Sequence, residues 1–229
     1  MVLILYLLLC AANILFDQIG FREGVLFTKP LLMPVLATWF LQQNRQGKVP
    51  AFRNLVIGAL LFSTAGDTLL MFAGGAGGAL YFLLGLSAFL LAHLCYIGAF
   101  FSIIKGKTGF LKTNPLYILP FLLYLGILLF VLYPGIPGGM KVPVVLYGCV
   151  ITGMALSVMH LRGRVPAGAW TSLMSGAVLF VLSDSLIALN KFGYPLGGAA
   201  VLIMITYVIG QYLLVRGSVR ILNSKTNSE

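Results

Sequence analysis

The sequence predicts an all-α integral membrane protein with eight transmembrane helices. Of its 229 residues, 60% are hydrophobic and 9% are charged, and the mean hydropathy is +1.02. Charged residues make up about 25% of a soluble domain, so this composition is typical of a polytopic membrane protein. The net charge of +10 is then a property of the loops, and we expect no nucleic-acid partner.

Eight apolar runs are long enough to be helices that cross a bilayer, which takes about 20 residues each. The first run has no Lys or Arg before it, so we expect a retained helix and not a cleaved signal peptide. Segments rich in turn-forming residues separate the later runs, for example GGAGG at 74–78 and RGRVP at 162–166. The predicted spans are roughly 1–17, 25–42, 54–73, 79–104, 115–133, 142–160, 168–190 and 196–216.

Basic residues are distributed unevenly between the two sides that this topology defines. Eleven of the 15 Lys and Arg residues lie in or beside the even-numbered loops and the C-terminal tail. Because cytoplasmic loops carry the excess of positive charge, we expect both termini in the cytoplasm, and an inner-membrane location if the source is bacterial. We also expect this basic collar to contact anionic membrane lipids. Its members are Arg45, Lys48, Arg53, Lys105, Lys107, Lys112, Arg162, Arg164, Arg216, Arg220 and Lys225, against Arg22, Lys29, Lys141 and Lys191 on the other side.

Two of the five acidic residues, Asp67 and Asp184, lie inside predicted spans. Both spans run outward from the cytoplasm, and at about 1.5 Å per residue the acids lie roughly 20 and 24 Å from the cytoplasmic end. A carboxylate inside a bilayer costs about 2.5–3.5 kcal/mol on insertion scales, so it should face the bundle interior or a wet cavity. We interpret the two acids as a functional site, with polar anchoring between helices as the alternative.

The two acidic segments resemble each other. Gly-Asp-Thr-Leu-Leu at 66–70 matches Ser-Asp-Ser-Leu-Ile at 183–187. Four spans separate the acids, which suggests a 4+4 parallel repeat with halves of about 1–112 and 113–222 inside one membrane domain of residues 1–229. A pseudo-twofold axis along the membrane normal would bring both acids toward one central cavity.

Other polar side chains are candidates for the lining of such a cavity. Lys29 lies on the outer side of the second span, where it could neutralise a carboxylate or extend to the interface. His93 and Tyr96 lie one turn apart, and Tyr207 and Gln211 lie four residues apart on one helix face. Each of these residues alone is more often helix packing than chemistry. The candidate lining residues are Lys29, His93, Tyr96, Tyr147, Ser183, Asn190, Tyr207 and Gln211.

The sequence contains no nucleotide-binding, serine-hydrolase or zinc-protease motif. Cys10, Cys95 and Cys149 all lie in apolar runs without ligand spacing, so we expect neither a metal nor a cofactor. Two carboxyl groups in a cavity of low polarity titrate as a pair, one protonated and one ionised. That suits acid-catalysed cleavage through a cation. It suits a proton-coupled transporter equally, so the residues alone leave both functions open.

Five motifs, in this order, resemble the YhhN family, the lysoplasmalogenase group that includes the animal transmembrane protein 86 proteins. They extend over most of the chain, and the two aspartate motifs together are the specific part of the resemblance. The motifs are Lys29-Pro30, FSTAGDTLLMF (62–72), AHLCYIGAF (92–100), GAVLFVLSDSLIALNKF (176–192) and TYVIGQYLL (206–214).

The resemblance implies an eight-helix membrane enzyme without a cofactor. Its substrate would be a lysophospholipid in the membrane, a lysoplasmalogen, cleaved at the vinyl ether to a fatty aldehyde and glycerophosphoethanolamine or glycerophosphocholine. In this reaction Asp67 and Asp184 would supply the acid and the group that orients water or stabilises the cation, in either order. Lys29 would tune one acid or contact the lipid phosphate, and His93, Tyr96 and Tyr207 would line the cavity. A proton-coupled transporter and a non-catalytic lipid-binding protein are the alternatives.

Overall fold

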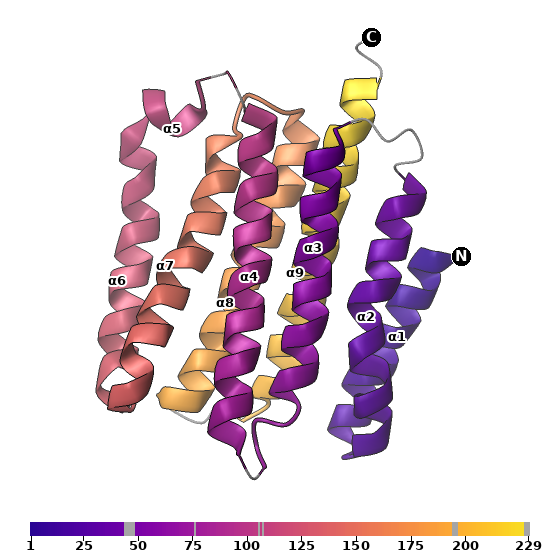
Figure 1. Ribbon diagram of the computed structural model, residues 1–229, viewed down its shortest axis with the longest axis vertical. Coiled ribbons are helices and arrows are strands. Elements are labelled where there is room, and N and C mark those ends of the chain that lie inside the picture. The colour runs from indigo at the N-terminus through magenta and orange to yellow at the C-terminus, as the bar shows by residue number, and fades with distance from the viewer. Residues whose placement is uncertain (44–48, 76, 105, 107, 194–196, 227–229) are drawn as a thin grey trace. The chain divides into compact units, whose positions relative to one another are not determined.

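The structure is a computed structural model that describes residues 1–43, 49–75, 77–104, 106, 108–193 and 197–226. Within these ranges every regular element is a helix, so the predicted all-α class is confirmed (Figure 1). The long helices are α1 (Val2–Gln18), α2 (Arg22–Gln43), α3 (Pro50–Leu70), α4 (Gly78–Ile104), α6 (Leu119–Leu132), α7 (Gly138–His160), α8 (Ala167–Phe192) and α9 (Ala199–Thr226). The short ones are α5 (Phe110–Thr113) and the 3-10 helices η1 (Pro115–Ile118) and η2 (Tyr133–Gly135).

Six helical segments in the described part of the chain are long and apolar enough to cross a membrane. They are α2, α4, Pro115–Gly135 around α6, α7, α8 and Ala199–Ser224 of α9. The protein is thus a multi-pass integral membrane protein. The apolar helix α1 is shorter, with 17 residues, and α3 has 21 residues but carries Arg53 and Asp67. The predicted number of eight spans, the orientation of the termini and the internal repeat stay predictions.

Prolines and glycines mark several helix ends. Pro50 is at the start of α3 and Pro166 caps the start of α8, where a proline loses no helical hydrogen bond. Gly20, between α1 and α2, has a φ of +72°, a conformation that favours glycine. Of the basic residues in the predicted collar, Arg45, Lys48, Lys105 and Lys107 lie outside the described residues, as does the side chain of Lys225.

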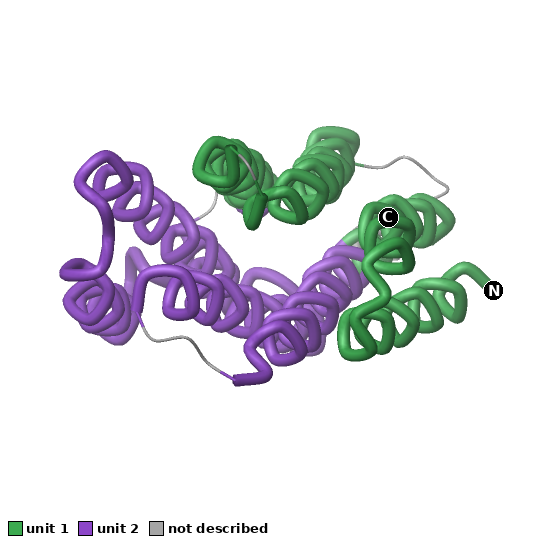
Figure 2. The backbone as a smooth tube through the Cα atoms, turned by 90° about the horizontal axis from the view of Figure 1, so that it is seen from below, with its two compact units in different colours: residues 1–99, 222–229 green, residues 100–221 purple. Residues whose placement is uncertain are grey.

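The chain divides into two compact units, coloured separately in Figure 2. The first unit comprises residues 1–99 and 222–229, and in it α2 contacts both α1 and α3. The second unit comprises residues 100–221, and in it α7 contacts both α6 and α8.

Glycines bring α8 and α9 into close contact within the second unit. A Cβ atom added at Gly176 would lie 2.7 Å from the Leu214 backbone nitrogen and 2.8 Å from the Gly210 carbonyl oxygen. A Cβ atom at Gly217 would lie 2.6 Å from the Leu173 side chain. Such close backbone approach is how small residues pack helices together inside a membrane, where water does not drive helix association.

Candidate active site

Asp67 lies in a buried group of polar side chains in the first unit. Its side chain is 3% exposed, and Ser63, one turn earlier on the same face of α3, is fully buried. The Tyr6 hydroxyl and the Cys10 thiol of α1 form a hydrogen bond, and Tyr6 lies within electrostatic range of Asp67 and Tyr96. Helices α1, α3 and α4 therefore all contribute to this group, which we call the Asp67 cluster.

Two glycines allow α3 and α4 to approach each other beside Asp67. A Cβ atom at Gly66 would lie 2.5 Å from the Phe89 ring of α4. A Cβ atom at Gly85 would lie 2.8 Å from the Leu70 side chain of α3. The close packing that these two positions permit encloses the neighbouring Asp67 in the unit.

His93 and Tyr96 project from α4 into the interior of the first unit. Both side chains are 0% exposed, and they lie one turn apart, so they share a face of the helix. Tyr96 belongs to the Asp67 cluster through its electrostatic interaction with Tyr6. An imidazole and a phenol on one buried face make this part of α4 polar. Buried groups of this kind are normally hydrogen-bonded.

Lys29 lies outside the Asp67 cluster, in a cavity of about 290 Å³ at the turn between α1 and α2. The cavity also contains Asp17 at the end of α1 and Arg22 at the start of α2. Met71, at the end of α3, is part of its wall. Met71 lies four residues after Asp67, so the two backbone positions are about 6 Å apart along the helix axis.

Asp184 is half-buried on α8 in the second unit and accepts a hydrogen bond from the Tyr147 hydroxyl of α7. The adjacent Ser183 is fully buried and donates a hydrogen bond of 3.0 Å to the Ile203 carbonyl oxygen of α9. Successive positions on a helix point about 100° apart. Ser183 therefore connects α8 to α9, while Asp184 faces α7.

Tyr207 and Gln211 are buried four residues apart on α9 in the second unit. The Tyr207 ring packs edge-on against Phe180 of α8, with 5.5 Å between the ring centroids. Asn190 is exposed near the end of α8 and lies about 9 Å along that helix from Asp184. The structure thus joins Tyr147 directly to Asp184 and separates Asn190 from it.

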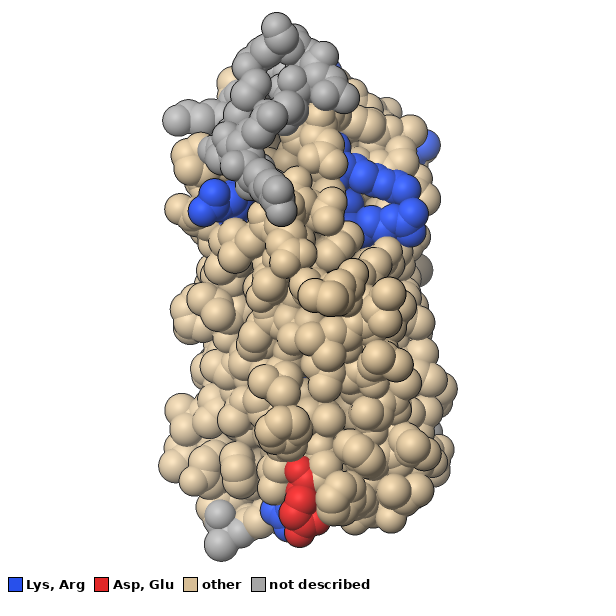
Figure 3. All heavy atoms as spheres, turned by 90° about the vertical axis from the view of Figure 1, so that its right-hand side faces the viewer, with Lys and Arg blue, Asp and Glu red and all other residues tan. Residues whose placement is uncertain are grey.

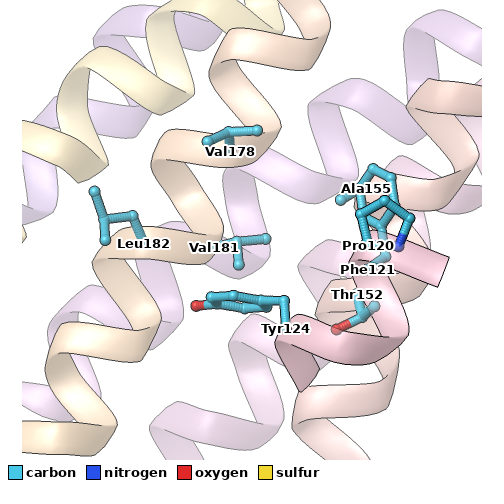
Figure 4. A pocket seen from close by; sticks show the side chains of 8 residues that line it. All are labelled: Pro120, Phe121, Tyr124, Thr152, Ala155, Val178, Val181 and Leu182. Carbon is cyan, nitrogen blue, oxygen red and sulfur yellow. The ribbon is translucent and has the colours of Figure 1, made fainter. Parts of the chain in front are cut away.

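An apolar cavity of about 290 Å³ lies between α6, α7 and α8 (Figure 4). The Tyr124 ring of α6 lies in this cavity, and its hydroxyl forms a hydrogen bond with Ser185, the residue after Asp184. Its walls otherwise consist of apolar side chains and Thr152, as is usual for a site that holds a hydrocarbon group. The lining residues are Pro120, Phe121, Tyr124, Thr152, Ala155, Val178, Val181 and Leu182.

Comparison with known proteins connects these sites to a family. The model of the YhhN family matches residues 25–218. The chain belongs to the YhhN family. The resemblance predicted from the five motifs is therefore confirmed, and the matched range includes both Asp67 and Asp184.

Several curated relatives of this YhhN protein are named lysoplasmalogenase. Human lysoplasmalogenase TMEM86B is 29% identical over 206 residues, which cover 89% of this chain and 78% of the relative. Human lysoplasmalogenase TMEM86A is 32% identical over 197 residues, or 82% of this chain and 75% of the relative. The lysoplasmalogenase of Mycobacterium tuberculosis is 30% identical over 166 residues, or 72% of this chain and 60% of the relative. No solved structure matches the chain.

The candidate lining residues of this YhhN protein did not include the polar interior face of α1. The buried residues of α1 are Tyr6, Cys10 and Asn13, all of which carry a hydrogen-bonding group. The Asn13 amide donates a hydrogen bond of 2.8 Å to the Thr28 hydroxyl, which donates one of 2.7 Å to the Gly24 carbonyl oxygen. The signal was the spacing of four and three residues, which puts the three on one face of an apolar helix.

Among the described residues, no group of three or more His, Cys, Asp and Glu side chains could hold a metal ion. The two cavities and the two aspartate environments consist of carboxylates, hydroxyls, amines and apolar side chains. These groups can hold a charged lipid headgroup and a hydrocarbon chain, and the carboxyl groups can donate or accept a proton.

Proposed function

We propose that this YhhN protein hydrolyses the vinyl ether bond of lysoplasmalogens, yielding a fatty aldehyde and glycerophosphoethanolamine or glycerophosphocholine. The observation that carries the proposal is the set of relatives named lysoplasmalogenase, from mammals and a mycobacterium, at about 30% identity. Two carboxyl groups inside apolar helices suit that reaction, since intramembrane ionisable residues commonly mark a functional site.

The chemistry requires an acid, a water molecule and stabilisation of a cation. An acid protonates the β-carbon of the vinyl ether, and the double-bond electrons form the new C–H bond, which leaves an oxocarbenium ion. Water adds to the α-carbon and loses a proton to a base, giving a hemiacetal. The hemiacetal collapses to the aldehyde and the glycerol hydroxyl. The acid gives up one proton and the added water returns one, so the net reaction is hydrolysis and consumes no nucleotide.

In the proposed mechanism, Asp67 and Asp184 are the acid and the group that orients water or stabilises the cation. Support comes from their surroundings within each unit. Asp67 is buried beside Tyr6, and Asp184 has one carboxylate oxygen fixed by the Tyr147 hydroxyl. A carboxylate fixed in this way acts from a set position, which general acid–base catalysis requires.

Supporting residues complete the proposal. His93, Tyr96 and Tyr207 would line the reaction cavity and hold water, with Ser183 and Gln211 positioning α8 and α9. The apolar cavity lined by Tyr124 and Leu182 would take the alkenyl chain.

The proposal also includes the topology. We propose eight spans, since α1 and α3 are helices at the predicted positions, with both termini in the cytoplasm and a 4+4 repeat. In a bacterial source the protein would lie in the inner membrane.

The test is aldehyde release from a lysoplasmalogen by the purified protein in a non-ionic detergent. Wild type is compared with Asp67→Asn, Asp184→Asn and Glu23→Gln, a matched amide substitution at an exposed acid of α2. We expect wild type and Glu23→Gln to release aldehyde, and each aspartate variant to lose at least about a hundredfold in rate, as for loss of a general acid or base.

The folded state of each variant is checked by its elution as a single species and its thermal denaturation. If all four proteins are folded and wild type releases no aldehyde, the hydrolase proposal fails and a lipid-binding or transport function takes its place. If the aspartate variants unfold and wild type is active, the acids are structural anchors, because removing one member of a buried polar network destabilises the fold.

A further inference from the structure

The cavity at the α1–α2 turn contains charges of both signs. Asp17 contributes a carboxylate, and Arg22 and Lys29 contribute two cations. Figure 3 shows acidic and basic atoms side by side at the lower end of the face that α1 and α2 form in Figure 1. Acidic residues are rare in this chain, with five among 229, so a carboxylate and two cations lining one cavity are an unusual local composition.

These three charged side chains form no contacts by which charged groups usually stabilise a fold, within the residues that the structure describes. Within the described part of the chain, the side chains of Asp17, Arg22 and Lys29 form no hydrogen bond or ion pair. The Lys29 side chain is half-buried, whereas Asp17 and Arg22 are exposed at the cavity. Charged groups that line a cavity without pairing are available for a ligand with complementary charges.

Backbone groups add to the same cavity. Pro30 has no N–H, so it cannot donate the helical hydrogen bond to the Leu26 carbonyl oxygen four residues earlier. Leu26 lines the cavity, and its carbonyl is thus an acceptor that residue 30 leaves unused. The first turn of α2 begins at Arg22, and its N–H groups favour an anion nearby.

We infer that this cavity binds the zwitterionic headgroup of the lysolipid and selects phosphoethanolamine. Arg22 and Lys29 bind the phosphate, while Asp17 and the Leu26 carbonyl accept hydrogen bonds from the ammonium group. The inference rests on the proposed function for the identity of the lipid. The volume of about 290 Å³ fits a headgroup better than a whole lipid, since sites for drug-sized ligands span about 300–1,000 Å³.

The position of the cavity agrees with the length of the substrate. Five bonds separate the sn-1 ether oxygen of a lysoplasmalogen from its phosphorus, a span of roughly 6 Å at about 1.2 Å per bond in an extended chain. The cavity wall at Met71 lies about 6 Å along α3 from Asp67. A phosphate held beside Met71 would therefore place the vinyl ether near the turn of α3 that carries Asp67.

The chemistry of the lining favours ethanolamine over choline. A primary ammonium donates hydrogen bonds to a carboxylate and a carbonyl, whereas the quaternary ammonium of choline has no N–H. Proteins usually hold choline in a cage of aromatic rings. Phe16 is the only aromatic residue in the lining described here.

The test measures binding of the saturated ether analogue 1-O-alkyl-glycerophosphoethanolamine, which lacks the double bond and cannot be cleaved. Its dissociation constant is determined by calorimetry in a non-ionic detergent, beside the choline analogue and the alkyl-glycerophosphate that lacks an amine. We expect wild type to bind the ethanolamine analogue about tenfold more tightly than the other two, the effect of one charge-assisted hydrogen bond.

Three variants and a control identify the residues responsible. Asp17→Asn should lose the preference for ethanolamine, while Arg22→Gln and Lys29→Gln should weaken binding of all three analogues about tenfold. Glu23→Gln, an exposed acid outside the cavity lining, should bind as wild type does. Equal binding of the three analogues by wild type, or an unchanged preference in Asp17→Asn, overturns the inference.

The outcome is separable from that of the hydrolase proposal, because the analogue reports binding without turnover. A protein that selects ethanolamine but releases no aldehyde keeps the headgroup site and loses the hydrolase function. A protein that releases aldehyde without headgroup preference keeps the hydrolase function and loses this site.

Discussion

The hydrogen bond between Tyr147 and Asp184 is the contact that fixes one proposed catalytic carboxylate. Tyr147→Phe removes only the hydroxyl and leaves the buried ring. We expect kcat/KM for aldehyde release to fall about 10- to 100-fold, because the carboxylate loses the donor that orients it. Steady-state kinetics in detergent measure this loss.

Tyr133→Phe is the matched control for that measurement. Tyr133 lies in η2 with half of its surface exposed, and its ring stacks against the Lys141 ammonium, a contact that phenylalanine keeps. Its kcat/KM should stay within about twofold of wild type, as is usual for surface substitutions away from a site. Equal losses in both tyrosine variants would contradict the role given to Tyr147.

At the residue scale, the sequence pointed to both acids and to Tyr147, the hydrogen-bond partner of Asp184, but not to the α1 residues beside Asp67. Asp67 and Asp184 stand out because a carboxylate in an apolar run is costly wherever the chain folds. Tyr6 and Cys10 are ordinary residues of an apolar helix, and their relation to Asp67 depends on contacts between residues some sixty positions apart. Such contacts follow from tertiary packing, which a pattern in one sequence does not contain.

The close packing of α8 against α9 can be tested with single methyl groups. Gly176→Ala places a Cβ atom 2.7 Å from the Leu214 backbone nitrogen, so the two helices must separate. We expect a loss of about 1–3 kcal/mol in the free energy of unfolding, the usual effect of overpacking. Titration with SDS, followed by circular dichroism, measures it.

Gly126→Ala on α6 makes the same chemical change where nothing lies within 4 Å of the new atom. This control should be neutral or more stable by up to about 1 kcal/mol, because alanine favours a helix over glycine. A similar loss at both positions would mean that helix propensity, and not packing, sets the effect.

At the element scale, hydropathy predicted helices well and their ends less well. The last span was expected to end near residue 216, whereas α9 continues to Thr226. Ser218, Ile221 and Leu222 are buried beyond that point, and the Ser218 hydroxyl donates to the Leu214 carbonyl oxygen. Hydropathy detects where a chain leaves the membrane, but a helix ends only where its hydrogen bonds and packing end.

Basic residues gather at one end of the second unit. Arg220 donates hydrogen bonds to the Gly168 carbonyl oxygen and the Ser172 hydroxyl near the start of α8. Arg162, in the connection before α8, stacks on Trp170 in the first turn of α8 and also on Phe110 and Tyr117. Aromatic and basic side chains together are typical of a membrane interface, and the excess of positive charge favours its cytoplasmic side.

The predicted orientation of the whole molecule is tested with reporter fusions in a bacterium. Green fluorescent protein fused after residue 229 should fluoresce, and alkaline phosphatase at the same point should be inactive, since both report a cytoplasmic C-terminus. A phosphatase fusion truncated after Gly75, between α3 and α4, should be active. Phosphatase activity at the C-terminus would contradict the proposed topology.

At the scale of the whole molecule, composition alone predicted the membrane class, because 9% charged residues cannot cover the surface of a soluble protein of this size. The division into units at Ala99 and Phe100 falls inside α4 and carries no mark in the sequence. Units of this kind are defined by contacts between helices, whereas hydropathy describes each helix separately. For the same reason, the meeting of the two aspartates at one substrate stays a prediction.

The helix α6 presents most of its surface outward, with Leu119, Leu123, Ile127 and Phe130 all exposed. The apolar cavity lies directly behind this helix. In the proposed reaction, the aldehyde carries the chain held in this cavity and needs to pass only hydrocarbon to reach the bilayer, while the glycerophospho product is soluble in water. One substrate molecule thus yields two products that partition into different phases. Inhibition by the aldehyde should depend on its concentration in the lipid, and inhibition by the glycerophospho product on its concentration in the water.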